Sequence, residues 1–234
     1  RRKKDSSMVV GLNLVKNGEA EGFVSAGSTG AILTGGLFIV GRLDGVERPA
    51  LGTCLPNKKG FSFLIDSGAN VDCKPQYLEQ FAKMGSVYAE NALGMKNPRV
   101  ALVNIGAEKE KGNALTKETY ELLEQAENIN FIGNIEPRNI PFGEADVIVC
   151  DGFVGNTVLK LTEGLYSITA SEGALTPFWQ GLNYEQTGGT PVLGVGAVVT
   201  IGHGKSTPKA IKNMILSTLH SVKIDLVGKL REKF

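Results

Sequence analysis

Three stretches of this chain place small, hydroxyl-bearing or amide-bearing residues directly after a predicted buried strand and before a predicted helix. They are residues 23–30, 100–113 and 146–160. Free N–H groups at such a turn, together with the positive end of the helix dipole, favour a negatively charged group. Open α/β sheets place their ligands at this kind of junction. Three such turns in one chain therefore predict one composite site for an anion.

Most of the donors in these turns are neutral, so each has a structural interpretation beside a functional one. Ser28, Thr29 and Asn156 stand where helices are predicted to begin, and a helix cap is their simplest role. As ligand contacts, the hydroxyl groups would donate to phosphate and the Asn156 amide would donate to a substrate oxygen. The residues predicted to contact substrate or phosphate are Gly27, Ser28, Thr29, Gly30, Asn104, Asp151 and Gly155.

Two basic side chains could take part in chemistry. Lys111 lies in a run, residues 108–113, in which carboxylates flank it. The run is either a charged surface loop or the place from which an ammonium group faces a phosphate or a developing oxyanion. His203, between two glycines at a strand end, is a better candidate than His220, which falls in a long predicted helix. Lys111, Asn156 and His203 are therefore the candidates for catalysis.

The acidic and metal-binding residue types suggest no metal centre. Asp66, Asp72 and Asp151 could orient a hydrogen-bond donor or a lysine, and Asp151 could instead brace its turn, but their spacing fits no standard metal loop. The chain has three cysteines without a Cys-x-x-Cys pair and only two histidines. This composition argues against a zinc site.

Several common classes of protein lack support in the sequence. There is no nucleotide P-loop, no dinucleotide-binding Gly-x-Gly-x-x-Gly followed by an acidic residue, and no Gly-x-Ser-x-Gly elbow of a hydrolase. A net charge of +1 gives no global reason to expect nucleic acid as a partner. Free thiols fit a reducing cytoplasm, and neither a secretory signal nor an apolar run of spanning length is visible.

The predicted elements alternate between strand and helix. This alternation predicts an α/β fold with a parallel or mixed sheet and helices on both faces. With no clear linker, we expect a single domain over residues 1–234, and an irregular or edge region at residues 42–60. The expected strands are 22–26, 61–65, 99–104, 129–132, 147–150 and 192–201, and the expected helices are 6–16, 29–40, 75–93, 115–126, 156–168 and 208–230.

Seven sequence blocks, taken together, resemble one family. In order they are residues 23–31, 36–42, 47–50, 66–75, 110–113, 130–136 and 145–156. Both the blocks and their order resemble the PlsX-type phosphate acyltransferases over roughly residues 1–165. The regions around Gly188-Gly189 and His203-Gly204 match further along the chain.

The resemblance implies transfer of a fatty acyl group from an acyl carrier protein thioester to inorganic phosphate. The product would be an acyl phosphate that feeds bacterial phospholipid synthesis. It also implies a fold similar to those of isocitrate and isopropylmalate dehydrogenases and of phosphotransacetylase. A cytoplasmic homodimer without a cofactor and with peripheral membrane contact is expected, and the functional lysine and asparagine of the family fall on Lys111 and Asn156.

The chain departs from the family pattern at three places. Ser28 stands where the family usually has Asn, which shortens the reach of that donor. Lys205-Ser206-Thr207 follows His203-Gly204, where the family has small polar residues and Asp. Only residues 165–187 fill a span that holds a long helical arm in the family. The resemblance thus implies that this arm and an N-terminal strand are missing from this chain.

These departures keep a second function open. A phosphate- or acyl-binding protein of the same fold could have lost turnover. A dehydrogenase of the related fold is argued against by the absent arginine cluster and metal-binding aspartate pattern. Because acyl carrier protein is acidic, a basic patch is also expected near the mouth of the active site, with Arg42, Arg48, Lys58 and Lys59 as candidates.

Overall fold

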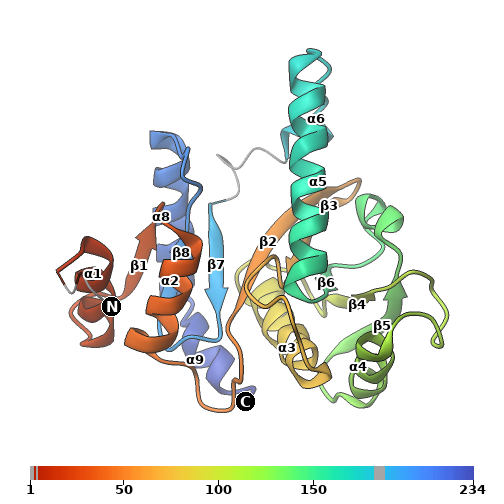
Figure 1. The fold of residues 1–234 in the computed structure, drawn as a ribbon, viewed down its shortest axis with the longest axis horizontal. Coiled ribbons are helices and arrows are strands. Elements are labelled where there is room, and N and C mark those ends of the chain that lie inside the picture. The colour runs from red at the N-terminus through yellow and green to blue at the C-terminus, as the bar shows by residue number, and fades with distance from the viewer. Residues whose placement is uncertain (1–2, 4, 182–187) are drawn as a thin grey trace. The chain divides into compact units, whose positions relative to one another are not determined.

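The computed structural model describes residue 3, residues 5–181 and residues 188–234. The chain divides into two compact units. The first unit consists of Arg1–Leu51 and Tyr184–Phe234, and the second consists of Gly52–Asn183. In Figure 1 the first unit combines red N-terminal elements with blue C-terminal ones, and the second holds the orange-to-cyan elements that come between these in sequence. A single domain over residues 1–234 stays a prediction.

The first unit is a small mixed sheet with helices. Strands β1 and β8, far apart in sequence, pair in parallel, and β8 pairs antiparallel with β7 (Figure 1). Strand β7 in turn pairs antiparallel with Ala50 and Leu51, the first residues of β2. The elements of this unit are α1 Ser7–Lys16, β1 Gly22–Ser25, α2 Thr29–Gly35, the π-helix η1 Gly36–Val40, β7 Thr190–Leu193, β8 Val198–Ile201, α8 Pro208–Lys223 and α9 Leu226–Arg231.

Three predictions for this part of the chain are wrong in detail. The strand expected over residues 192–201 is two strands, β7 and β8, which pair antiparallel with each other. The helix expected over residues 208–230 is two helices, because Asp225 adopts a left-handed conformation and its carboxylate caps α9 by accepting from the N–H of Gly228. Residues 42–60, expected to be irregular or an edge, contain β2 at Ala50–Asn57, which has hydrogen-bonded neighbours on both sides.

The second unit contains most of the parallel sheet. Its strand order is β2-β3-β6-β4-β5, in which β2 and β3 form an antiparallel hairpin and the remaining pairs are parallel. The elements are β2 Ala50–Asn57, β3 Gly60–Ile65, α3 Pro75–Asn91, β4 Arg99–Val103, α4 Ala114–Gln125, β5 Asn130–Ile135, the 3₁₀ helix η2 Pro137–Phe142, β6 Val147–Val149, α5 Gly152–Ser171 and α6 Pro177–Gln180.

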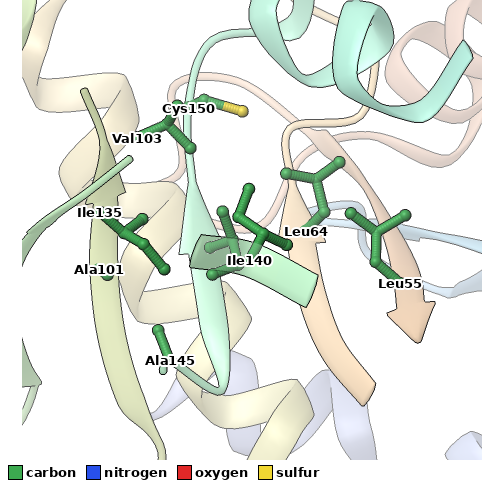
Figure 2. Close-up of a cluster of buried hydrophobic side chains, with 9 residues drawn as sticks. Leu55, Leu64, Ala101, Val103, Ile135, Ile140, Ala145 and Cys150 are labelled. Carbon is green, nitrogen blue, oxygen red and sulfur yellow. The ribbon is translucent and has the colours of Figure 1, made fainter. Parts of the chain in front are cut away.

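Helices cover both faces of this sheet, as the sequence predicts. Alternate side chains of a strand point to opposite faces. Leu64 and Ile148 belong to the buried cluster of Figure 2, against which Val154 and Val158 of α5 pack. Ile65 and Val147 point the other way, where Gly85 of α3 lies so close that an added Cβ would be 2.7 Å from the Val147 side chain.

Cys150 completes the cluster in Figure 2 as a small buried hydrophobic residue. Its Sγ lies 3.8 Å from the carbonyl oxygen of Asp66. Burial raises the pKa of this thiol well above its usual value of 9.0, with the charges of Asp151 and Asp66 as further causes. Cys150 therefore stays protonated and contributes packing rather than a nucleophile.

The amino-terminal end of the sheet is held by an ion pair. Asp146 accepts hydrogen bonds from Nε (3.0 Å), Nη2 (2.9 Å) and the backbone N–H (2.8 Å) of Arg99. Burial raises the pKa of the Asp146 carboxyl, but the Arg99 hydrogen bonds and charge outweigh burial, so its pKa lies below the usual 3.8. The pair links the starts of β4 and β6.

We predict that Asp146→Asn lowers the free energy of unfolding at pH 7 by about 1–2 kcal/mol, a figure reduced because the pair is partly exposed. A carboxyl whose pKa is depressed on folding stabilises above its unfolded pKa of about 3.9 and loses that effect as the pH falls through the folded pKa. Urea unfolding between pH 7 and pH 3 should show wild type and Asp146→Asn converging. Glu127→Gln, at an exposed loop carboxylate, is the control, and a gap that stays constant with pH contradicts the prediction.

Candidate functional site

Three loops of the second unit follow the carboxyl ends of neighbouring parallel strands. Residues 66–74 follow β3, residues 104–113 follow β4, and residues 150–151 follow β6. Because β3, β6 and β4 run parallel, these loops leave the same edge of the sheet. They bring Asn104, Lys111, Asp151, Gly155 and Asn156, all predicted from the sequence, to that edge.

The loop after β3 is organised around one buried carboxylate. Asp66 has no exposed surface. Its carboxylate accepts the backbone N–H groups of Gly68 (3.1 Å), Ala69 (3.0 Å) and Asn70 (2.7 Å) and the Asn70 side-chain amide (2.8 Å). These N–H groups therefore point inward and do not face a ligand.

Helix α5 begins four residues earlier than predicted, at Gly152. The cap is Asp151, whose carboxylate accepts the N–H of Val154 at 2.8 Å. The interpretation of Asn156 as a cap is wrong, because it is the fifth residue of the helix. Aspartate and asparagine are both good caps, so the local sequence does not distinguish them. Of the two roles left open for Asp151, the structure supports bracing the turn.

Two glycines let α5 rest directly on the loop after β3. The N–H of Gly152 donates to the carbonyl oxygen of Asn70 at 2.6 Å. A Cβ added at Gly152 would lie 2.7 Å from that oxygen, and one at Gly155 would lie 1.9 Å from the carbonyl oxygen of Asp66. Gly155 was predicted as a phosphate contact, and its observed environment is this close backbone packing.

Asn156 presents its amide at an exposed position beside the same loop. Gly68 has a φ of +139°, and a Cβ added there would lie 3.4 Å from the Asn156 Cβ and 3.5 Å from its Oδ1. Within residues 5–181 and 188–234, the Asn156 amide has no hydrogen-bond partner. It is therefore free to donate to a ligand.

The loop after β4 is held by Asn104, which is 5% exposed. Its Nδ2 donates to the carbonyl oxygen of Lys111 at 3.0 Å, and its Oδ1 accepts the N–H of Ile105 at 2.8 Å. Both ends of the amide thus bind the loop backbone, and contact with phosphate stays a prediction. The cap of α4 is Asn113, which accepts the N–H of Thr116 at 2.9 Å.

Lys111 is exposed at the end of this loop. Among the residues that the structure describes, its ammonium group forms no ion pair, although Glu108 and Glu110 are close in sequence. The neighbouring Lys109 pairs with Glu124 of α4. The ion pairs of a charged surface loop are thus made by Lys109, and the Lys111 charge is available to an anion.

The first unit holds the other predicted residues at the carboxyl ends of its parallel strands β1 and β8. Gly27–Gly30 are exposed, and Ser28 occupies the cap position of α2 although its hydroxyl makes no capping bond within the described chain. His203 Nδ1 accepts the N–H of Lys205 at 3.1 Å. A neutral His203 therefore carries its proton on Nε2. One composite site that includes these residues stays a prediction.

The third acidic candidate, Asp72, is exposed in the segment after β3, and no metal-binding cluster of His, Cys, Asp or Glu occurs in the described parts of the chain.

Cys73 lies close to Asp66 and Asp151. Burial, followed by the charges of Asp66 and Asp151, raises its pKa to about 12, so this thiol is not a ready nucleophile.

Sequence reasoning missed how the loop after β3 supports the site. The parts played by Gly68, Asn70 and Gly152 follow from contacts between segments about 80 positions apart. The Asp-x-Gly-x-Asn pattern that begins at Asp66 was the available signal, since Asp side chains often bind the N–H groups of the following turn.

The chain matches the family model described as "Fatty acid synthesis protein" over residues 1–172. It is 50% identical to a phosphate acyltransferase from Clostridium perfringens, with 100% of this chain and 74% of the relative covered. It is 48% identical to a phosphate acyltransferase from Halothermothrix orenii, with 100% and 76% covered. Such identity over the whole chain establishes common family membership.

Solved structures share the fold at low sequence identity. EutD phosphotransacetylase from Staphylococcus aureus matches with a TM-score of 0.66 and 19% identity, over 92% of this chain and 66% of that one. A 4-hydroxythreonine-4-phosphate dehydrogenase from Klebsiella pneumoniae matches with a TM-score of 0.56 and 13% identity, over 90% and 67%. These matches confirm the predicted α/β fold of the dehydrogenase type. By its sequence, the chain belongs to the PlsX-type phosphate acyltransferases and is an acyltransferase of that family.

Proposed function

We propose that this chain transfers a fatty acyl group from the thioester of acyl carrier protein to inorganic phosphate. The observation that carries the proposal is the pair of free donors at one sheet edge, the Lys111 ammonium and the Asn156 amide. Each is exposed and lacks a partner among the described residues, while the loops that present them are internally hydrogen-bonded. This arrangement suits binding an anion and a developing negative charge.

The reaction needs positioning and charge stabilisation rather than a protein nucleophile. A phosphate oxygen attacks the thioester carbonyl carbon, and the C–S bond breaks as the tetrahedral intermediate collapses to acyl phosphate and a thiolate. Lys111 neutralises charge on phosphate or on the oxyanion, and the Asn156 Nδ2 donates to the same oxygen. Held donors of this kind are effective because they need no reorganisation during the reaction.

The start of α5 contributes less to anion binding than its position suggests. Asp151 already accepts the N–H of Val154, and Asn70 accepts that of Gly152. Two N–H groups of the first turn are thus engaged, and a carboxylate stands at the helix terminus. Anion binding at this edge therefore falls mainly to the side chains of Lys111 and Asn156, with the helix dipole as a weaker, general contribution.

The residues of the first unit have supporting roles in the proposal. Ser28, Thr29 and the adjacent glycines would donate to phosphate, and His203 in its protonated form would act as the acid for the leaving thiolate. The assignment of Gly27–Gly30 and His203 to this reaction rests on the resemblance of their sequence blocks to the family. The Ser28 hydroxyl, which makes no capping bond within the described chain, fits its role as a donor.

The proposed partners are acyl carrier protein, inorganic phosphate and a fatty acyl chain, and the acyl phosphate would serve phospholipid synthesis. We also propose a homodimer in the cytoplasm with peripheral membrane contact and no nucleic-acid partner. Every helix in the described residues is too short or too polar to cross a membrane. Lys58 and Lys59 lie at the hairpin turn before β3, whereas Asp66 follows its other end, so neither lies at the site edge of this unit.

An assay of acyl carrier protein release from a long-chain acyl thioester tests the proposal. Release should require phosphate, and one acyl phosphate should form for each thiol released. Sulfate is the matched control, because it resembles phosphate in shape and charge but is a poor nucleophile. Equal release in sulfate, release that requires a nicotinamide cofactor, or phosphate binding without turnover would each overturn the proposed reaction.

A further inference from the structure

Asp66 makes an unusual number of contacts for a residue outside the proposed reaction. It is a fully buried carboxylate at the carboxyl end of β3, and it binds three consecutive backbone N–H groups of its own loop. Burying a carboxylate is costly unless such donors surround it. An apolar residue would avoid this cost, so the contacts that the carboxylate organises need an explanation.

The loop held by Asp66 meets the first turns of α5 at three points. The Asn70 carbonyl accepts the N–H of Gly152, and the Asp66 carbonyl lies against Gly155. Gly68 lies against the Asn156 side chain. On the loop side, these three contacts are made by Asp66, Gly68 and Asn70. The backbone N–H groups of Gly68 and Asn70 donate to the Asp66 carboxylate, and the third contact is made by the backbone of Asp66 itself.

We infer that Asp66 is a positioning residue that sets the orientation of the Asn156 amide through Gly68. This inference rests on the proposed function, in which Asn156 donates to the reacting oxygen. Gly68 forms the surface beside Asn156, and its place is determined by the hydrogen bond from its N–H to the Asp66 carboxylate (3.1 Å). A hydrogen-bond donor lowers the reaction barrier fully only when it is held in the correct position, since a displacement of about 1 Å lowers the rate about 10²-fold.

A carboxylate suits this role better than an amide. Both Asp66 oxygens accept, Oδ1 from Gly68 and Ala69 and Oδ2 from Ala69 and Asn70. Asparagine at this position has nearly the same shape, but its NH₂ group would face N–H donors whichever way the amide is turned. Asp66→Asn should therefore shift the loop while changing the volume of the buried site very little.

The test is a double-mutant cycle with Asp66→Asn, Asn156→Ala and the double variant, assayed for acyl phosphate formation. Asp66→Asn should lower kcat by about 10–100-fold and leave KM for the thioester within about threefold. In the Asn156→Ala background it should have almost no further effect, because the group it positions is absent. A purely structural role would lower activity by the same factor in both backgrounds.

Asp146→Asn is the matched control. It also removes a carboxylate that accepts a backbone N–H group, but at the amino-terminal end of the sheet, and it should keep kcat within about twofold. If Asp66→Asn does not fold, Asn70→Ala tests the same connection, because it removes the side-chain donor to Asp66 and keeps the carboxylate. This variant should show a smaller loss of kcat that also disappears in the Asn156→Ala background.

Equal losses in the two backgrounds, or a full kcat for Asp66→Asn, would overturn the inference while the proposed function stands. A wild-type chain that releases acyl carrier protein without phosphate overturns the proposed function instead. Wild-type turnover by Asn156→Ala also removes the donor role on which the inference depends. The phosphate dependence of the wild type, measured beside the variants, thus separates the two failures.

Discussion

Replacing Lys111 with alanine is expected to lower kcat for acyl phosphate formation by about 10²–10³-fold, the loss typical of removing one donor to an oxyanion. The physical reason is the free ammonium charge at the site edge. Asn104 holds the backbone of this residue, and no described carboxylate pairs with its side chain. Steady-state kinetics with long-chain acyl thioester at saturating phosphate is the measurement.

Lys109→Ala is the matched control for this prediction. It removes the same charge two positions away in the same loop, but from an ammonium group already paired with Glu124. Its kcat should stay within about twofold of wild type. Equal losses in the two variants would mean that the general positive charge of the loop matters and that Lys111 has no specific role.

Gly155→Ala is expected to destabilise the protein by about 1–3 kcal/mol, the usual cost of overpacking. It should also lower kcat by about 10²-fold, because α5 and Asn156 must move away from the loop. The added Cβ would lie 1.9 Å from the backbone carbonyl oxygen of Asp66, where no side-chain rotation can relieve the clash. Thermal or urea unfolding and the same kinetic assay measure the two effects.

The control for this variant lies on the same helix. Gly164 also belongs to α5, but a Cβ added there would meet no atom within 4 Å. Gly164→Ala should therefore stabilise by about 0.5–1 kcal/mol, as expected from helix propensity. Opposite signs for the two substitutions are the predicted result. Stabilisation by Gly155→Ala would show that α5 does not rest on the loop after β3.

Local sequence patterns predict a strand or the start of a helix correctly where one residue type strongly favours that structure. The apolar run at Val147–Val149 predicts a buried strand, and Pro75 predicts the start of α3, as observed. The pattern misled at β2, because glycine and proline in residues 50–57 weaken a strand signal. The backbone hydrogen bonds to β3 and β7 compensate for that weak propensity, and they depend on strands at other places in the chain.

The sequence by itself determined the α/β class, the family and the residue types available for chemistry at each strand end. Only the tertiary structure decided which of those residues are free to act. Asp151 rather than Asn156 caps α5, Asn104 is engaged in its loop, and Lys109 rather than Lys111 is paired. The physical reason is that hydrogen bonds with partners far away in sequence decide whether a polar side chain is already bonded or is free for a ligand. Local periodicity does not encode these partners.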